Sequence, residues 1–100
     1  MRVISKQTLR RFWEGASGRA DARRALEAWH REARRAAWQA PQDIKRQYAS
    51  ASVLKGGRVV FNICGNRYRL VVRINYPQQI VLIRFIGTHT EYDAIDAEAV

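Results

Sequence analysis

Side chains able to bind phosphate groups gather in the segment of residues 67–73. Arg67, Arg69 and Arg73 occupy alternating positions of an apolar run there, and Val71 completes the series. Side chains of a β-strand alternate between its two faces, so the three arginines are expected on one face and apolar residues on the other. Guanidinium groups bind phosphate oxygens through paired, charge-assisted hydrogen bonds. The segment therefore predicts a phosphate-binding face on a sheet.

A histidine and a tyrosine, His89 and Tyr92, follow the last apolar run of the chain. Imidazole exchanges its proton near neutral pH, whereas Arg and Lys stay protonated, so His89 is the candidate general base or acid. Tyr92 could stack on a base or donate its hydroxyl. A lone histidine in a turn is also commonly an exposed or capping residue, and the residue types alone leave that alternative open.

Other polar residues could extend such a site. Lys55 could add charge at its rim, and Asn62 could orient a ribose or a base edge. Arg84 interrupts an apolar strand, so we expect it to meet an anionic partner or ligand. Glu91 and Asp93 flank the tyrosine without forming the ligand cluster of a two-metal nuclease, and helix capping accounts for them. We expect no metal and no cofactor.

The chain is strongly basic for its length of 100 residues. It has 18 Lys and Arg against 9 Asp and Glu, a formal net charge of +9, which attracts polyanions such as RNA or DNA. No apolar run approaches the roughly 20 residues of a membrane-spanning helix, and the first residues lack signal-peptide architecture. We therefore expect no membrane partner and a cytoplasmic location. The length predicts one domain over residues 1–100. Cys64, the only cysteine, excludes an intramolecular disulfide, and we expect a buried thiol.

Hydrophobic spacing divides the chain into helices followed by strands. The expected helices cover residues 6–14, about 19–38 and 41–48, the expected strands residues 1–5, 58–64, 67–74 and 79–86, and a short terminal helix runs from a capping box of Thr90 and Asp93 to about Ala97. Residues 49–57 are expected to be a connector. Gly65 and Asn66 tolerate positive φ and predict a two-residue turn between the first two long strands. The last strand is nearly all apolar, as expected of a central strand covered on both faces.

The second of the expected helices carries several arginines on its polar side. Gly15, Ser17 and Gly18 are expected to separate it from the first, and its arginines are Arg23, Arg24, Arg31, Arg34 and Arg35. These arginines could bind phosphates, but any solvated amphipathic helix shows a charged outer face, and we favour that interpretation. His30 is expected at the surface, and the three tryptophans, Trp13, Trp29 and Trp38, are expected in the core.

The chain resembles the HigB family of bacterial toxins, within the RelE superfamily. The resemblance rests on residues 61–66 and 68–72, on residues 88–93, and on the order of the elements. It implies an α+β protein with a small RelE-like fold, in which N-terminal helices pack on an antiparallel sheet and a short helix ends the chain. It also implies an endoribonuclease that cleaves messenger RNA on the translating ribosome, and a cognate antitoxin of the helix-turn-helix HigA type.

The resemblance also assigns residues to the site. Arg69 takes the place of the phosphate-binding arginine of the superfamily, polar positions of the HigB motifs are matched by Asn62, Asn66, His89 and Tyr92, and Lys55 and Arg73 match more loosely. Asn62 stands where RelE proteins place a lysine, and His89 lies in a loop that is rich in lysine and arginine in those proteins. These two departures leave the identities of the proton donor and acceptor open.

The expected function is thus that of a toxin that cleaves translated mRNA without a metal and thereby inhibits growth. Arg69, His89 and Tyr92 are the expected catalytic residues, and RNA contacts are expected from Lys55, Asn62, Asn66, Arg73 and Arg84. One alternative is a basic RNA- or DNA-binding module without catalysis. Another is a toxin of the same fold that acts on a protein such as gyrase. In such toxins the ribonuclease residues are largely absent, so the presence of Arg69, His89 and Tyr92 argues against a protein target.

Overall fold

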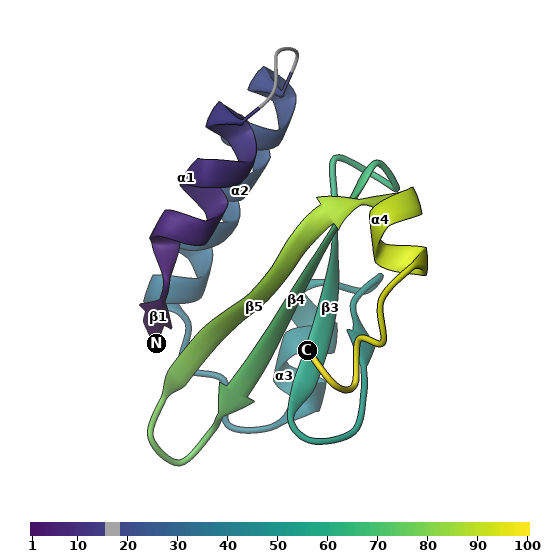
Figure 1. Cartoon of the computed structure of the whole chain (residues 1–100). Coiled ribbons are helices and arrows are strands. Elements are labelled where there is room, and N and C mark those ends of the chain that lie inside the picture. The colour runs from purple at the N-terminus through teal and green to yellow at the C-terminus, as the bar shows by residue number, and fades with distance from the viewer. Residues whose placement is uncertain (16–18) are drawn as a thin grey trace.

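The computed structural model describes residues 1–15 and 19–100 (Figure 1). Its helices are α1 (Lys6–Glu14), α2 (Ala20–Arg35), α3 (Pro41–Gln47) and α4 (His89–Asp93), and its strands are β1 (Arg2–Ile4), β2 (Ser52–Val53), β3 (Arg58–Ile63), β4 (Tyr68–Asn75) and β5 (Ile80–Thr88). The expected α+β class, with a short helix near the C-terminus, is confirmed.

The strands form one five-stranded sheet in the order β1-β5-β4-β3-β2. The pairs β2–β3, β3–β4 and β4–β5 are antiparallel, but β1 lies parallel to β5, with Val3 opposite Val81. The sheet is therefore mixed rather than purely antiparallel. β4, not β5, is its central strand, because β1 and β4 flank β5 while β4 has two strands on either side.

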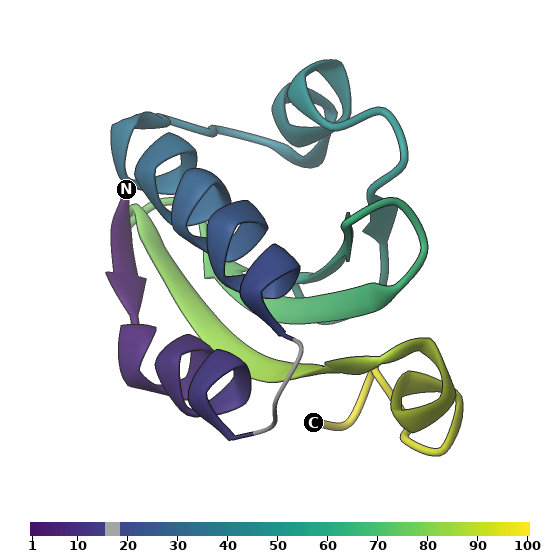
Figure 2. The same ribbon diagram turned by 90° about the horizontal axis from the view of Figure 1, so that it is seen from above.

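The first three helices pack against one face of the sheet, which we call the helix face. Figure 2 shows α2 running across this face with α1 beside it. The core contains Leu9 and Phe12 from α1, Leu26 and Trp29 from α2, Ile44 from α3, and Phe61, Leu70, Val72 and Val81 from the strands. Phe61 has its ring centroid within 6.1 Å of those of Trp29, Trp38 and Tyr48. Trp13 packs against the same cluster, so the expected core role of all three tryptophans is confirmed.

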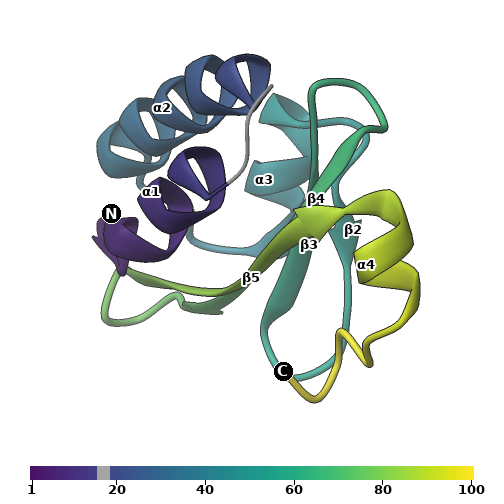
Figure 3. The same cartoon turned by 45° about the horizontal axis from the view of Figure 1, so that its top comes forward.

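The opposite face of the sheet, here called the open face, is only partly covered. Val60 and Val71 lie on it and form a second, smaller cluster with Ala97, against which Phe85 and Tyr92 pack. Figure 3 shows the chain after α4 running beside β2 and β3, away from α1 and α2. Arg58 donates from Nε and Nη2 to the backbone oxygen of Val100, at 3.0 and 2.9 Å. The C-terminal segment thus covers the middle of the open face and reaches Arg58, while Arg73 stays exposed.

The β3–β4 connection differs from the predicted two-residue turn. Strand pairing stops at Ile63 opposite Tyr68, so the loop has four residues, 64–67. The backbone N–H of Arg67 donates to the Cys64 carbonyl at 3.3 Å, which places Gly65 and Asn66 at the centre of the turn. Positive φ falls on Cys64 (54°) and Gly65 (66°), not on Asn66. The position of the turn was predicted correctly, but its length was wrong.

Arg84 lies at a β-bulge. Val71 pairs with Phe85 and Val72 with Ile83, so Arg84 is an extra residue in β5 without a partner on β4. Its side chain is exposed. The bulge explains how an apolar strand accommodates a charge, so the inference that this arginine requires an anionic partner loses its basis.

Several element boundaries also differ from expectation. α2 ends at Arg35 rather than near residue 38, and the expected connector contains the two-residue strand β2. α4 begins at His89 with Thr88 as its N-cap, so a capping box of Thr90 and Asp93 was wrong, and the helix ends before Ala97. The expected break at Ser17 and Gly18 lies outside the described residues.

His30 is a buried residue of α2, with 8% of its surface exposed, and its expected place at the surface was wrong. Burial, followed by the positive charges of Lys6 and Arg34, lowers the pKa of His30 below its ordinary value. The folded state therefore disfavours the protonated imidazole.

We expect His30 to make the protein less stable in mild acid. A lowered folded-state pKa means that the unfolded chain binds the proton more readily, so stability is complete above about pH 6.5 and declines as the pH falls through the lowered value. Urea unfolding at pH 7 and pH 5 should show a smaller loss of stability for His30→Gln than for the wild type. Equal losses in the two proteins would contradict this role.

Candidate active site

Arg69 is the central cation at one end of the open face. Strand register places it opposite Asn62 on β3 and Gly87 on β5. Its side chain is half-buried, and Nη1 donates to the carbonyls of Asn66 and Tyr68 at 3.1 and 3.4 Å. No carboxylate within residues 1–15 and 19–100 forms an ion pair with it. The guanidinium is thus fixed by two carbonyls while its charge stays available to an anion.

A capping box holds α4 at the end of β5, beside Arg69. Thr88 Oγ1 accepts from the Glu91 N–H at 3.2 Å, and Glu91 Oε1 accepts from the Thr88 N–H at 2.8 Å. The hydrogen bond from the Thr88 backbone also lowers the pKa of Glu91. The His89 N–H donates to the Arg67 carbonyl at 3.1 Å, which ties the start of α4 to the start of β4. His89 is therefore placed two residues beyond Gly87, the partner of Arg69.

The imidazole of His89 has a carboxylate partner. Its Nδ1 lies 3.0 Å from Oδ2 of Asp93, one helical turn later, and both side chains are more than half exposed. This contact favours the tautomer with the proton on Nδ1, leaving Nε2 as the free acceptor. Sequence reasoning treated Asp93 as a capping residue, but its contact is with His89. The i, i+4 spacing on a helix was the signal for this pair.

Tyr92 belongs to the apolar cluster of the open face. It is half-buried and packs with Val71, Phe85 and Ala97. Its ring therefore joins α4 to the middle of the sheet, between the residues around Arg69 and the C-terminal segment. Its expected part in stacking or proton donation stays a prediction.

Arg67 does not share the face of the other arginines. Its Nη1 lies 2.6 Å from Oδ2 of Asp21 on α2, and Tyr68 Oη lies 3.2 Å from Oδ1 of the same carboxylate. Cys64 Sγ also donates to the Asp21 carbonyl at 3.3 Å. Arg67 lies in the four-residue loop, where the alternation of a strand no longer applies, so its predicted face was wrong. Its contacts join the loop to α2.

The same contacts account for Cys64. The residue is half-buried, so the expected buried thiol is only partly correct. Burial, followed by the nearby Asp21 carboxylate, raises the pKa of the Cys64 thiol. A raised pKa keeps the thiol protonated and suits a structural role.

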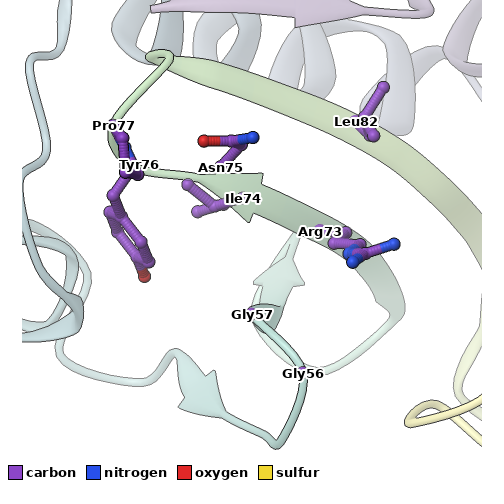
Figure 4. A pocket seen from close by; sticks show the side chains of 8 residues that line it. All are labelled: Gly56, Gly57, Arg73, Ile74, Asn75, Tyr76, Pro77 and Leu82. Carbon is purple, nitrogen blue, oxygen red and sulfur yellow. The ribbon is translucent and has the colours of Figure 1, made fainter.

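The remaining predicted RNA-binding residues do not lie around Arg69. Arg73 is four residues further along β4, which corresponds to about 13 Å at the rise of a strand. It borders a hollow of about 470 Å³ near the turn that contains Lys55 (Figure 4). Arg84 lies at its bulge on β5. The structure thus divides the predicted site into one group with Asn62, Asn66, Arg69 and His89, and another with Lys55 and Arg73.

The described residues contain neither a cluster of metal ligands nor a helix that could span a membrane. Residues 1–15 and 19–100 bring together no group of three His, Cys, Asp or Glu side chains that could hold a metal ion. No helix in these same ranges is long and apolar enough to cross a membrane.

A mixed sheet with helices on one face, and with an arginine and a histidine at one end of the other, defines a small RelE-like α+β protein. The model of the HigB toxin family, described as the RelE-like toxic component of a toxin-antitoxin system, matches residues 22–95. The chain belongs to this family, so it is a toxin with an antitoxin partner. The match includes every predicted site residue but neither β1 nor α1. A comparison with curated proteins finds no match to the chain.

Proposed function

We propose that this toxin is a metal-independent endoribonuclease that cleaves messenger RNA on the translating ribosome. The observation that carries the proposal is the placement of Arg69 and the His89–Asp93 pair at one exposed end of the sheet. The resemblance to HigB and RelE toxins implies RNA cleavage, and the net charge of +9 favours a polyanionic substrate.

The proposed chemistry is attack of a ribose 2′-OH on the adjacent phosphorus. The 2′-oxygen loses its proton and forms a bond to phosphorus, the bond from phosphorus to the 5′-oxygen breaks, and that oxygen gains a proton. The products are a 2′,3′-cyclic phosphate and a 5′-hydroxyl. The reaction needs a base, an acid, and cations that stabilise the extra negative charge of the phosphorane.

His89 is the proposed proton-transfer group. Asp93 at Nδ1 leaves Nε2 free to accept a proton as base, and the protonated ring could donate it as acid. The exposure of both side chains allows RNA to reach the imidazole. The pH dependence of cleavage by a His89 variant distinguishes the two roles.

Arg69 is the proposed clamp on the scissile phosphate. The two carbonyls that hold its Nη1 fix the guanidinium before substrate arrives, as required of a group that stabilises a transition state. Asn62, the cross-strand neighbour of Arg69, and Asn66, which supplies one of the carbonyls, are proposed to contact the ribose or a base. Tyr92 on α4 is proposed to stack on a base or to donate its hydroxyl.

The proposal extends to the partners and the setting of the protein. We propose translated mRNA and the ribosome as targets, a helix-turn-helix antitoxin of the HigA type as the cognate inhibitor, a cytoplasmic location and a single domain. A binding module without catalysis would instead bind RNA in a salt-dependent manner and leave it intact.

Induced expression in bacteria tests the function. We expect growth arrest, fragmentation of translated messages, and relief of both when the cognate antitoxin is expressed with the toxin. Growth arrest with intact messages would favour a protein target such as gyrase. Normal growth with intact messages, at confirmed expression of soluble protein, would contradict a toxic nuclease.

A further inference from the structure

The hollow beside Arg73 lies at the end of β4 opposite to Arg69. Its volume of about 470 Å³ falls in the range of small-molecule pockets, about 300–1,000 Å³. Figure 4 shows where its walls come from: the turn before β3, the end of β4, the following turn and β5. The lining residues are Gly56, Gly57, Arg73, Ile74, Asn75, Tyr76, Pro77 and Leu82.

Two arginines face each other beside the hollow. Arg58 and Arg73 are directly opposite each other on β3 and β4. They share the open face, because Val60 and Val71, two residues from each along the strands, belong to its cluster. Like charges directly opposite on one sheet face are destabilising, and an anion between them removes the penalty.

Arg73 is the member of this pair that is free to bind. Arg58 is half-buried and donates twice to the Val100 oxygen, whereas Arg73 is exposed. Among the described residues, no Asp or Glu side chain forms an ion pair with either arginine, and the Val100 oxygen is the partner of Arg58 alone. Lys55 adds a third cation in the adjacent turn. A phosphate group fits this charge and the donor geometry of a guanidinium.

Gly56 and Gly57 form one wall of the hollow. Both have positive φ, 71° and 74°. A Cβ on Gly57 would lie 2.9 Å from the Ile74 carbonyl oxygen, and a Cβ on Gly56 would lie 2.8 Å from Arg58 Nη1. The positive φ of both residues and the Ile74 carbonyl beside Gly57 thus favour glycine, and this wall of the hollow is main chain without side chains.

The other lining groups suit a nucleoside better than an inorganic anion. Leu82 and Pro77 offer apolar contacts, and Asn75 carries an amide beside them. That amide is already oriented, because Asn75 Oδ1 accepts from the Gln78 N–H at 3.1 Å and Nδ2 donates one of its two N–H groups to Gln78 Oε1 at 3.3 Å. An oriented amide next to apolar groups can read the edge of a base.

We propose that this hollow is a nucleotide subsite, in which Arg73 binds a phosphate and the Gly56–Gly57 wall, Leu82 and Asn75 receive the attached nucleoside. It lies about 13 Å from Arg69 along β4. One RNA strand lying along the open face could therefore present its scissile phosphate to Arg69 and a nucleotide a few positions away to the subsite. The part played in cleavage rests on the proposed function, whereas nucleotide binding does not.

Amide NMR spectra of the whole protein test the subsite without any cleavage. The probes are AMP, GMP, CMP and UMP, with adenosine and inorganic phosphate as separate arms. We expect at least one monophosphate to shift the amide signals of Gly56, Gly57 and Asn75 in a saturable manner, and to bind more tightly than adenosine or phosphate. Arg73→Ala should weaken this binding at least about tenfold, as expected when a hydrogen bond to a charged group is lost.

Arg10→Ala is the matched control. It removes the same charge from an exposed helix position, where Arg10 pairs with Glu14 at 3.8 Å, and it should bind the monophosphate as the wild type does. Arg73→Lys should retain part of the affinity. Equal affinities in Arg73→Ala and the wild type, equal binding of phosphate and monophosphate, or the absence of shifts at the glycines would each overturn the subsite.

Failure of the subsite is distinguishable from failure of the nuclease. A wild-type protein that binds the monophosphate but cleaves no RNA contradicts the proposed function alone. A wild-type protein that cleaves RNA while the signals of Gly56 and Gly57 do not respond contradicts the subsite alone.

Discussion

Replacing Arg69 by alanine should lower the rate of RNA cleavage by about 10²–10³-fold, the usual effect of removing one donor that stabilises transition-state charge. The side chain is half-buried on the open face and held by the carbonyls of Asn66 and Tyr68. Its loss removes a fixed positive charge from the place where the phosphorane would form. Single-turnover cleavage of RNA is the appropriate measurement, because it isolates the chemical step.

Two further variants serve as controls for Arg69→Ala. Arg10→Ala removes the same charge from α1, on the other side of the sheet, and should keep wild-type activity. Arg69→Lys retains the charge without the fork of donors and should recover only part of the rate. Full activity in a folded Arg69→Ala protein would remove this residue from the site.

Replacing His89 by alanine should lower the cleavage rate by about 10²–10⁴-fold, the range for loss of a general acid or base. The imidazole is exposed, so the change should leave the fold intact. The pH dependence of the rate should lose one limb, and which limb is lost reveals whether His89 is the base or the acid. Asp93→Asn should have a smaller effect in the same direction, because it weakens the orientation of the ring.

The protein contains a suitable control for the loss of a histidine. His30 is the other of its 2 histidines and is buried on α2, on the helix face. His30→Gln should retain cleavage at pH 7. If His89→Ala cleaves as fast as the wild type across the pH range, proton transfer belongs to another group.

Much of the fold was predictable because the spacing of hydrophobic residues along the sequence indicates which side of a helix or strand is buried. α1 lies at the expected residues, and the faces of β4 alternate as predicted from Tyr68 onward. The missed features depend on contacts that periodicity does not record. The parallel pairing of β1 joins residues nearly eighty positions apart, and β2 has only two residues, too few for any period to be visible.

The spatial arrangement of the predicted site residues could not be derived from alternation alone. Alternation assigned Arg67 to the face of Arg69, but the strand begins at Tyr68 and the loop turns Arg67 to Asp21. At Arg84 a bulge interrupts the alternation. The separation of Arg73 from Arg69 follows from their four-residue spacing along β4.

The most direct test is cleavage of a defined messenger RNA by the purified protein in the presence of translating ribosomes. The wild type should produce new 5′ ends within the translated region, with a 2′,3′-cyclic phosphate on the upstream fragment, and Arg69→Ala and His89→Ala should each produce far fewer. Intact message with the wild type, or equal cleavage by all three proteins, would contradict a nuclease centred on Arg69 and His89.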